Sequence, residues 1–338
     1  GKLSNQKYCY LWLKVLKYTE EGMNKESIIF FLDLIFNPNV KNNAFLNIDK
    51  QKSKLKQDII SIKDNKVKYS VLKLMEKMKE KEYSYNTFGY LEDLEDITGE
   101  ELYTYYEKVL KEDQIDVFIL GDIDESQIKE IFKEYFKVTT FKKNNKDLLI
   151  KELLPRKRIV RYHEYDKVNQ AQLIILCSLN NLTEFERRYT IKLYNEIIGG
   201  SANSILFENV REKHSYCYYV NSSVKAYDNI LLINSGVEQE NIDKTIKLVR
   251  KTLKSITEGK LKEENIISAK NTIISGIKSA SDEPMGIINT YFSKVLVGTP
   301  NEEERIANFN KITKEDIVKV SKKVTLHTIL TLESKEDE

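Results

Sequence analysis

The chain has 338 residues, 41% of them hydrophobic and 31% charged, which is typical of a soluble globular protein large enough for two domains. Its 54 Lys and Arg are balanced by 52 Asp and Glu, and a net charge of +2 argues against a protein that binds nucleic acid. No apolar run reaches membrane-spanning length. The three cysteines form no C-x-x-C pair and are interpreted as reduced core residues, so we expect a cytoplasmic protein without a membrane partner.

The first 138 residues alternate between strand-like and helical patterns. Thr98 is expected to begin a helix, with Glu101 three residues later completing a capping box. Asn24 is expected to cap an earlier helix that ends at Asn37-Pro38. In chain order we expect a strand at 8–15, a helix at 24–37, one long helix or two at 50–81, a helix at 98–110, a buried strand at 115–120 and a helix at 125–136.

The polar segment 139–156 is predicted to be a linker, and further strands and helices follow it. Several of these strands succeed one another without an intervening helix, which favours an α/β (α+β) fold with antiparallel sheet. The predicted elements are strands at 158–163, 172–177 and 230–236, a helix capped by Thr183, a helix at 241–256, helices on either side of Pro284, and a last helix and strand.

The order of elements repeats along the chain. The segment Ile97–Leu102, with its helix and the strand after it, matches Ile312–Ile317 and the elements after it, at an offset of 215 residues (312 − 97). The strand, turn and helix of 10–38 likewise parallel those of 230–259. We therefore expect two homologous domains, each a largely antiparallel sheet covered by helices.

The domain boundaries follow from this repeat. The first domain is expected at 1–138, the linker at 139–156 and the second domain at 157–338. The second copy begins near Ile159, 153 residues before Ile312 (312 − 159), and the same step back from Ile97 falls before Gly1. The first domain is therefore expected to be incomplete at its N-terminus.

One stretch of the second domain carries candidate binding residues. The pair Gly199-Gly200 is expected to end a helix, and a short amphipathic helix and an aromatic strand follow. Arg211 leaves that helix and Tyr218 lies on the strand, so both side chains can reach one surface. A guanidinium beside a phenol suits the carbonyl oxygens of an extended peptide, or an oxyanion. The alternative interpretation is a surface arginine and a half-buried tyrosine.

At this point the sequence resembles the pitrilysin/insulinase-like (inverzincin) zinc peptidases. The resemblance rests on the glycine pair, on Leu206-Phe207, on the run Val210-Arg211-Glu212-Lys213 and on Tyr218, which look like the substrate-binding Arg/Tyr region of that family. It extends over essentially the whole chain, because the duplicated domain and the linker also fit. The segments 31–38 and 69–96 look most like the non-catalytic subunit of paired bacterial processing peptidases.

The resemblance implies a zinc site that these residues lack. In that family a helix carries H-x-x-E-H, whose histidines bind zinc and whose Glu activates water, and a more distant Glu is the third ligand. This chain has only His163, His214 and His327, no two within five residues, so no metal ligand is assigned. Asp49 falls roughly where the third ligand would be, but it is better interpreted as a helix-start carboxylate. His214 is interpreted as an exposed turn histidine.

Three functions remain open from the sequence. The first is a subunit of a zinc-dependent processing peptidase that binds extended peptide through Arg211 and Tyr218 and is not catalytic on its own. It has no catalytic residue or cofactor in this chain, and it pairs as a heterodimer with a subunit that carries H-x-x-E-H, or with itself. The second is a complete zinc metalloendopeptidase whose zinc-binding helix, with its zinc, lies upstream of Gly1. The third is a non-enzymatic scaffold of the same fold.

Overall fold

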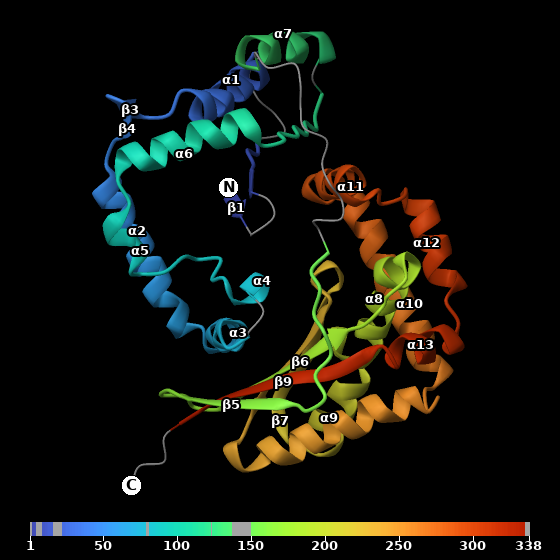
Figure 1. Ribbon diagram of the computed structural model, residues 1–338. Coiled ribbons are helices and arrows are strands. Elements are labelled where there is room, and N and C mark those ends of the chain that lie inside the picture. The colour runs from blue at the N-terminus through green and yellow to red at the C-terminus, as the bar shows by residue number, and fades with distance from the viewer. Residues whose placement is uncertain are drawn as a thin grey trace. The chain divides into compact units, whose positions relative to one another are not determined.

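A computed structural model describes residues 2–4, 9–15, 22–78, 81–122, 124–136 and 150–334. The chain forms two compact units (Figure 1). Unit 1 consists of residues 1–61 and 86–145, and unit 2 of residues 62–85 and 146–338. The architecture is mixed α/β, as the sequence predicts. No helix within the described ranges is long and apolar enough to cross a membrane.

Unit 1 is mostly helical in its described part. Aromatic rings pack together in it: the Phe45 ring lies edge-on to the rings of Tyr103 and Tyr106, at centroid distances of 5.6 and 5.5 Å. The Tyr106 hydroxyl also donates to the carbonyl of Ile35, 2.6 Å away. The elements are α1 (Met23–Phe36), α2 (Ile48–Ser61), α5 (Asp93–Asp96), α6 (Gly99–Glu112), α7 (Glu125–Tyr135) and two antiparallel pairs, β1 (Lys2–Ser4) with β2 (Cys9–Leu11) and β3 (Val40–Lys41) with β4 (Ala44–Phe45).

The start of α6 confirms the predicted capping box. The Glu101 amide donates to Thr98 Oγ1 at 3.1 Å, and the Thr98 amide donates to Glu101 Oε2 at 3.2 Å. Lys52 on α2 fixes the preceding turn, since its Nζ donates to the carbonyls of Glu95 and Ile97 at 2.9 and 3.0 Å. Short-range sequence thus specifies this helix start. The start of α1 was predicted wrongly, because Gly22 with a φ of 85° is its N-cap and not Asn24.

The buried strand predicted at 115–120 is a further wrong prediction. These residues are all described, and none belongs to a helix or strand. Val117 and Leu120 are each 47% exposed. A strand is defined by hydrogen bonds to a neighbour, and no described residue pairs with this segment. An apolar, β-branched run alone therefore does not produce a strand here.

Unit 2 is built on a five-stranded sheet in the order β5-β9-β6-β8-β7. β5 and β9 are parallel and the other neighbours antiparallel. β6 is buried along its whole length because both faces of the sheet are covered. The strands are β5 (Val160–Tyr165), β6 (Ala171–Leu179), β7 (Cys217–Lys225), β8 (Ile230–Val237) and β9 (Val324–Glu333).

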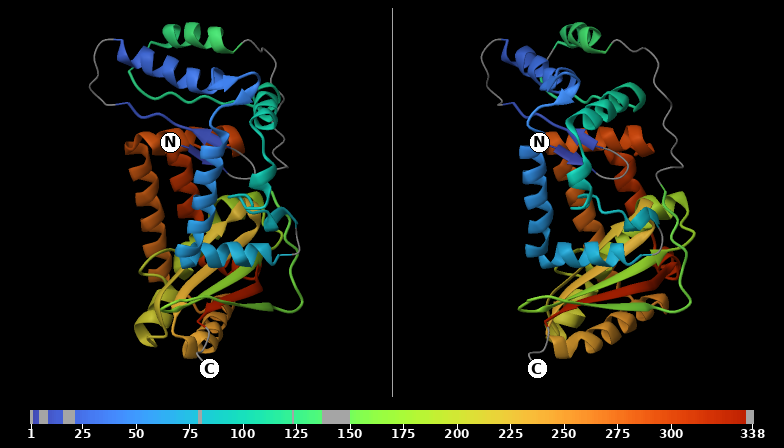
Figure 2. Two further views of the ribbon diagram at one scale, coloured as in Figure 1. Left: turned by 90° about the vertical axis from the view of Figure 1, so that its left-hand side faces the viewer. Right: turned by 60° about the vertical axis from the view of Figure 1, so that its left-hand side comes forward.

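The helices between residues 184 and 321 cover one face of this sheet (Figures 1 and 2). Residues such as Leu173, Ile175 and Ile233 pack against them in the main core. The helical segments are η3 (Glu186–Thr190), α8 (Ile191–Asn195) and η4 (Glu196–Gly200), which run on as one helix 184–200, then η5 (Phe207–Lys213), α9 (Ile242–Thr257), α10 (Glu263–Asp282), α11 (Pro284–Val297), α12 (Glu302–Lys311) and α13 (Lys314–Ser321).

The opposite face is covered by α3 (Lys66–Glu76), a helix that lies within the predicted first domain. Leu74 of α3 is fully buried against Ile174, Leu176 and Leu330 of the sheet. The turn η1 (Ile62–Asp64) separates α3 from α2, so the predicted 50–81 helix is two helices. The domain boundaries predicted at 138 and 157 stay a prediction. Residues 139–149 of the predicted linker lie outside the described residues.

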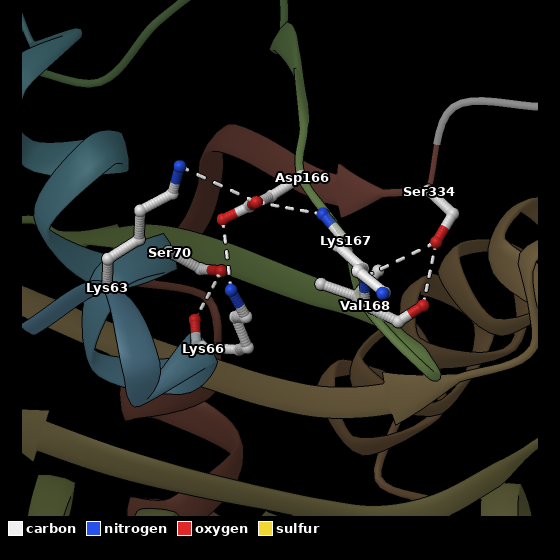
Figure 3. A network of polar contacts seen from close by, with 7 residues as sticks. All are labelled: Lys63, Lys66, Ser70, Asp166, Lys167, Val168 and Ser334. Atoms are coloured by element: carbon white, nitrogen blue, oxygen red, sulfur yellow. Dashed lines mark hydrogen bonds and ion pairs between the residues drawn. The ribbon is translucent and has the colours of Figure 1, made fainter.

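A polar network holds α3 to the sheet (Figure 3). Asp166, directly after β5, accepts from Lys66 Nζ at 3.0 Å and forms an ion pair with Lys63 at 3.5 Å. The Lys66 hydrogen bond is the first of the causes that lower the pKa of the Asp166 carboxyl. Ser334, directly after β9, donates to the carbonyl of Val168 at 2.7 Å.

Candidate peptide-binding site

The helix 184–200 brings the glycine pair against strand β7. Thr183 and Glu186 form a capping box at its start, with the Thr183 amide donating to Glu186 Oε2 at 2.7 Å. At its end, a Cβ added to Gly199 would lie 2.7 Å from Ser222 Oγ and 2.9 Å from the Ser222 amide nitrogen. Only glycine therefore allows this close approach of helix and strand.

The segment η5 presents Arg211 to solvent. Leu206 and Val210 are fully buried in the main core, and Arg211 next to Val210 is exposed. Its Cζ lies 4.8 Å from the centroid of the Phe207 ring, a distance at which a cation interacts favourably with an aromatic face. In the part of the chain that the structure describes, the Arg211 guanidinium has no hydrogen bond or ion pair. Its five N–H donors are available to a ligand.

Tyr218 lies on β7, which is an edge strand of the sheet. The register with β8 shifts between Cys217 and Tyr219, so Tyr218 is the extra residue of a β-bulge. Its side chain is 58% exposed. Its hydroxyl donates to Glu238 Oε1, and this hydrogen bond, followed by the Glu238 charge, raises the pKa of the Tyr218 phenol. The phenol therefore stays protonated, with its proton directed at Glu238.

The bulge also interrupts the alternation of side chains between the two faces of β7. Cys217 and Val220, three positions apart, both contribute to the main core, so strict alternation does not hold here. Tyr219 instead donates to Gln172 on β6. Sequence reasoning missed Glu238, although its position just after β8, the neighbour of β7, is the signal that could have found it.

Arg211 and Tyr218 are both exposed, and in the described part of the chain no hydrogen bond or ring contact joins the two side chains. The two groups differ in chemical state. The guanidinium is free to donate, whereas the phenol already donates to Glu238. A peptide carbonyl would bind to Arg211 directly but would have to replace Glu238 to accept a hydrogen bond from Tyr218.

The structure also shows where the three histidines and Asp49 lie. Among the described residues, no group of three or more His, Cys, Asp or Glu side chains could hold a metal ion. His214 Nδ1 lies 2.7 Å from the carbonyl of Asn209, and His163 Nδ1 lies 3.0 Å from Glu333 Oε1. His327 is buried beside Thr328. Asp49 is exposed in the first turn of α2, as expected for a helix-start carboxylate.

Comparison with known proteins identifies the class. Residues 96–273 match the family described as the peptidase M16 inactive domain. The chain is 28% identical over 314 residues to a protein of Bacillus subtilis (strain 168) named "Probable inactive metalloprotease YmfF", covering 90% of this chain and 72% of that protein. This chain therefore belongs to the peptidase M16 family of metallopeptidases, in a branch named as inactive.

Solved structures agree on the fold. A conserved protein from Enterococcus faecalis V583 superposes with a TM-score of 0.84 at 26% identity, covering 95% of this chain and 76% of that one. The peptidase M16 inactive domain from Pseudomonas fluorescens superposes with a TM-score of 0.73 at 16% identity, covering 94% and 77%. The predicted fold class and the predicted resemblance to inactive members of this peptidase family are both confirmed.

Proposed function

We propose that this chain is the non-catalytic, peptide-binding subunit of a zinc-dependent processing peptidase. Its membership of the M16 family and its similarity to a protein named inactive support the non-catalytic part. The observation that carries the binding part is Arg211, an exposed guanidinium that lies over the Phe207 ring and has no hydrogen bond or ion pair among the described residues. A cation held in place by a ring but left without an acceptor is suited to a ligand's oxygen.

In this proposal an extended peptide lies along the edge of the sheet at β7. An edge strand has unpaired backbone N–H and C=O groups that can hydrogen-bond to an added strand. Arg211 donates to a carbonyl oxygen of the peptide. Tyr218 either accepts an N–H of the peptide while it still donates to Glu238, or donates to a second carbonyl after Glu238 is displaced.

Catalysis would come from a partner subunit that carries H-x-x-E-H. Zinc bound there would lower the pKa of a water molecule and polarise the scissile carbonyl. The residues of this chain would hold the substrate in register and leave proton transfer to the partner. A complete enzyme with its zinc helix upstream of Gly1 is the alternative. If the 338-residue chain alone bound zinc stoichiometrically, this result would contradict both the proposed non-catalytic subunit and the non-enzymatic scaffold.

The test is the double variant Arg211→Ala, Tyr218→Phe in the 338-residue chain. Binding of a fluorescently labelled extended peptide is measured by anisotropy, and cleavage is measured after mixing with an H-x-x-E-H subunit. We expect peptide affinity to fall at least tenfold and cleavage to fall with it, because charge-assisted hydrogen bonds to the backbone are lost. The unfolding midpoint should not change, since both side chains are exposed.

The matched control is Arg250→Ala, Tyr291→Phe. Arg250 is an exposed arginine of α9, and Tyr291 of α11 is 57% exposed against 58% for Tyr218. This control should bind and support cleavage as the unmodified chain does. Equal peptide affinity and cleavage in the test variant and the control would refute the role of the pair and favour a scaffold.

Glu238→Gln separates the two ways in which Tyr218 can act. The amide keeps an oxygen acceptor but removes the charge that, with the hydrogen bond, raises the pKa of the phenol. If the peptide must displace Glu238, the variant should bind peptide more tightly, because a neutral acceptor competes less strongly for the phenol proton. If Tyr218 accepts from a peptide N–H, affinity should fall or stay the same.

A further inference from the structure

Unit 2 contains a cavity of about 450 Å³ that the peptide site does not use. It lies between the helix 184–200, the last part of β7 and the helices α10, α11 and α12, which gather on one side of the unit (Figure 1). Neither Arg211 nor Tyr218 lines it. The volume is in the range of pockets that hold small organic molecules. The side chains that matter most are those of Lys192, Glu196, Ile273, Arg305 and Phe309.

Three cations line the cavity, but only one of them is neutralised. Arg188 is paired with Glu184 and donates to the carbonyls of Val297 and Gly298, so it joins the helix 184–200 to the end of α11. The side chains of Lys192 and Arg305 have no hydrogen bond or ion pair to any residue that the structure describes. The positive charge on this wall is therefore incompletely balanced by the protein.

The surroundings of Lys192 are unfavourable for its own charge. Its side chain is solvent-exposed and is part of the cavity lining. Desolvation, followed by the charges of Arg305 and Arg188, lowers the pKa of the Lys192 amine. An anion bound between Lys192 and Arg305 would offset this repulsion.

The remaining lining restricts the kind of anion. Glu196 contributes a carboxylate whose Oε1 is buried and has no hydrogen-bond partner among the described residues, and this charge disfavours a dianion such as phosphate. Part of the cavity wall is apolar and is formed by Val224, Ile273 and Phe309. A monoanion with a hydrocarbon part therefore matches the cavity better than an inorganic ion.

We propose that this cavity binds the carboxylate of a small apolar acid, with Lys192 and Arg305 holding the carboxylate and Ile273 and Phe309 contacting the hydrocarbon part. Two sources share this chemistry: a free short-chain carboxylic acid and the C-terminal residue of an apolar peptide. The inference does not depend on the proposed function, because the two sites have no residue in common.

The test is isothermal titration of the full 338-residue chain with three probes. N-acetyl-leucine represents a peptide C-terminus, hexanoate represents a free acid, and N-acetyl-leucinamide has the shape of the first without its charge. We expect at least one of the two acids to bind. If N-acetyl-leucine binds, N-acetyl-leucinamide should bind at least tenfold more weakly. Which acid binds more tightly identifies the source of the carboxylate.

Variants locate the site. Lys192→Gln and Arg305→Gln should each weaken binding of that acid about tenfold, as expected for loss of one charge-assisted hydrogen bond. The matched control Lys251→Gln removes an exposed lysine of α9 that does not line the cavity, and should bind as the unmodified chain does. The peptide-site variant Arg211→Ala, Tyr218→Phe should also bind the acid normally.

Three results would overturn the inference. The first is that neither acid binds, and the second is that N-acetyl-leucine is the tighter acid but the amide binds equally tightly. The third is that Lys192→Gln binds the tighter acid as tightly as the control Lys251→Gln does. Circular dichroism confirms folding of each variant before titration. Should Arg305→Gln fail to fold, Lys192→Gln decides alone, since the Lys192 side chain is exposed.

Discussion

In both copies of the repeat, a lysine holds the turn that precedes a capped helix, but the segments after that helix differ. Lys52 in unit 1 donates to the carbonyls of Glu95 and Ile97, and Lys270 in unit 2 donates to those of Asn310 and Ile312, at 2.9 and 2.7 Å. Both acceptor pairs are related by the offset of 215 residues predicted from the sequence (310 − 95 and 312 − 97). Each turn leads into a capping box and a helix, α6 in unit 1 and α13 in unit 2.

The copies diverge at the strand. β9 follows α13 and lies between β5 and β6 in the centre of a sheet, whereas 115–120 follows α6 and belongs to no strand. The comparison teaches that a capped helix start is specified within a few residues, while a strand exists only through its neighbours. Changes to a strand should thus have different effects in the two copies, and changes to a cap the same effect.

The largest effect is expected for Leu330→Ala in β9. Leu330 is fully buried against α3, and removing its side chain should lower the free energy of unfolding by about 2–5 kcal/mol. Leu120→Ala, in the segment 115–120 of unit 1, should cost less than about 0.5 kcal/mol because Leu120 is 47% exposed. Urea unfolding measures both. Equal losses would show that 115–120 is as well packed as β9.

Thr98→Ala and Thr313→Ala should cost about 1 kcal/mol each, because each removes the side-chain acceptor of a capping box. The same urea experiment applies, and Thr104→Ala, on the exposed side of α6, serves as a control within a helix. If one cap proved several times more costly than the other, the capped start would depend on tertiary packing and the comparison would fail.

Asp166→Asn tests the network that holds α3 to the sheet of unit 2. The pKa of Asp166 is lowered in the folded state, so its contribution is present above the ordinary aspartate pKa of about 3.9 and is lost as pH falls through the lower folded value. We expect a loss of about 0.5 kcal/mol at neutral pH, since one carboxylate meets two partly exposed lysines. The difference between variant and unmodified chain should vanish below that folded pKa, and a constant difference would contradict the network.

The smallest effect is expected for Lys192→Met, which should raise the free energy of unfolding where the other substitutions lower it. The pKa of Lys192 is lowered in the folded state, so the unfolded chain holds this proton more readily and stability rises as pH rises from the folded value to the ordinary one. Arg188, Arg305 and Glu196 are the charged groups around it. Removing the cation should stabilise the chain by a few tenths of a kcal/mol at neutral pH. This gain should disappear above about pH 10.4, and a destabilised variant would refute the unbalanced charge.

Much of the fold could be predicted from local pattern. The helix capped by Thr183, the fully buried strand β6 and the helix α9 lie where their sequences place them, because caps and periodic apolar residues act over a few positions. The helix α3 could not be assigned to the sheet of unit 2 in this way. Its burial depends on residues such as Leu330, more than 250 positions away in the chain.

The candidate site was predicted only in part. Arg211 and Tyr218 are exposed as the sequence analysis expected, and their role stays a prediction. The bulge at Tyr218 and the hydrogen bond to Glu238 depend on the register of β7 against β8, which no local pattern specifies. The cations Lys192 and Arg305 stand 113 positions apart, and each alone is an ordinary surface residue of a helix.

The sequence by itself determined the family, the repeat and the helix starts at Thr98 and Thr183, because these are recorded in short runs of residues and in their spacing. Only the tertiary structure decided which apolar run became a strand, which helix covers the second face of the sheet, and which cations share a cavity. The physical reason is that strand pairing, burial and charge repulsion are properties of groups brought together by the fold, and their strength depends on distances that the chain order does not contain.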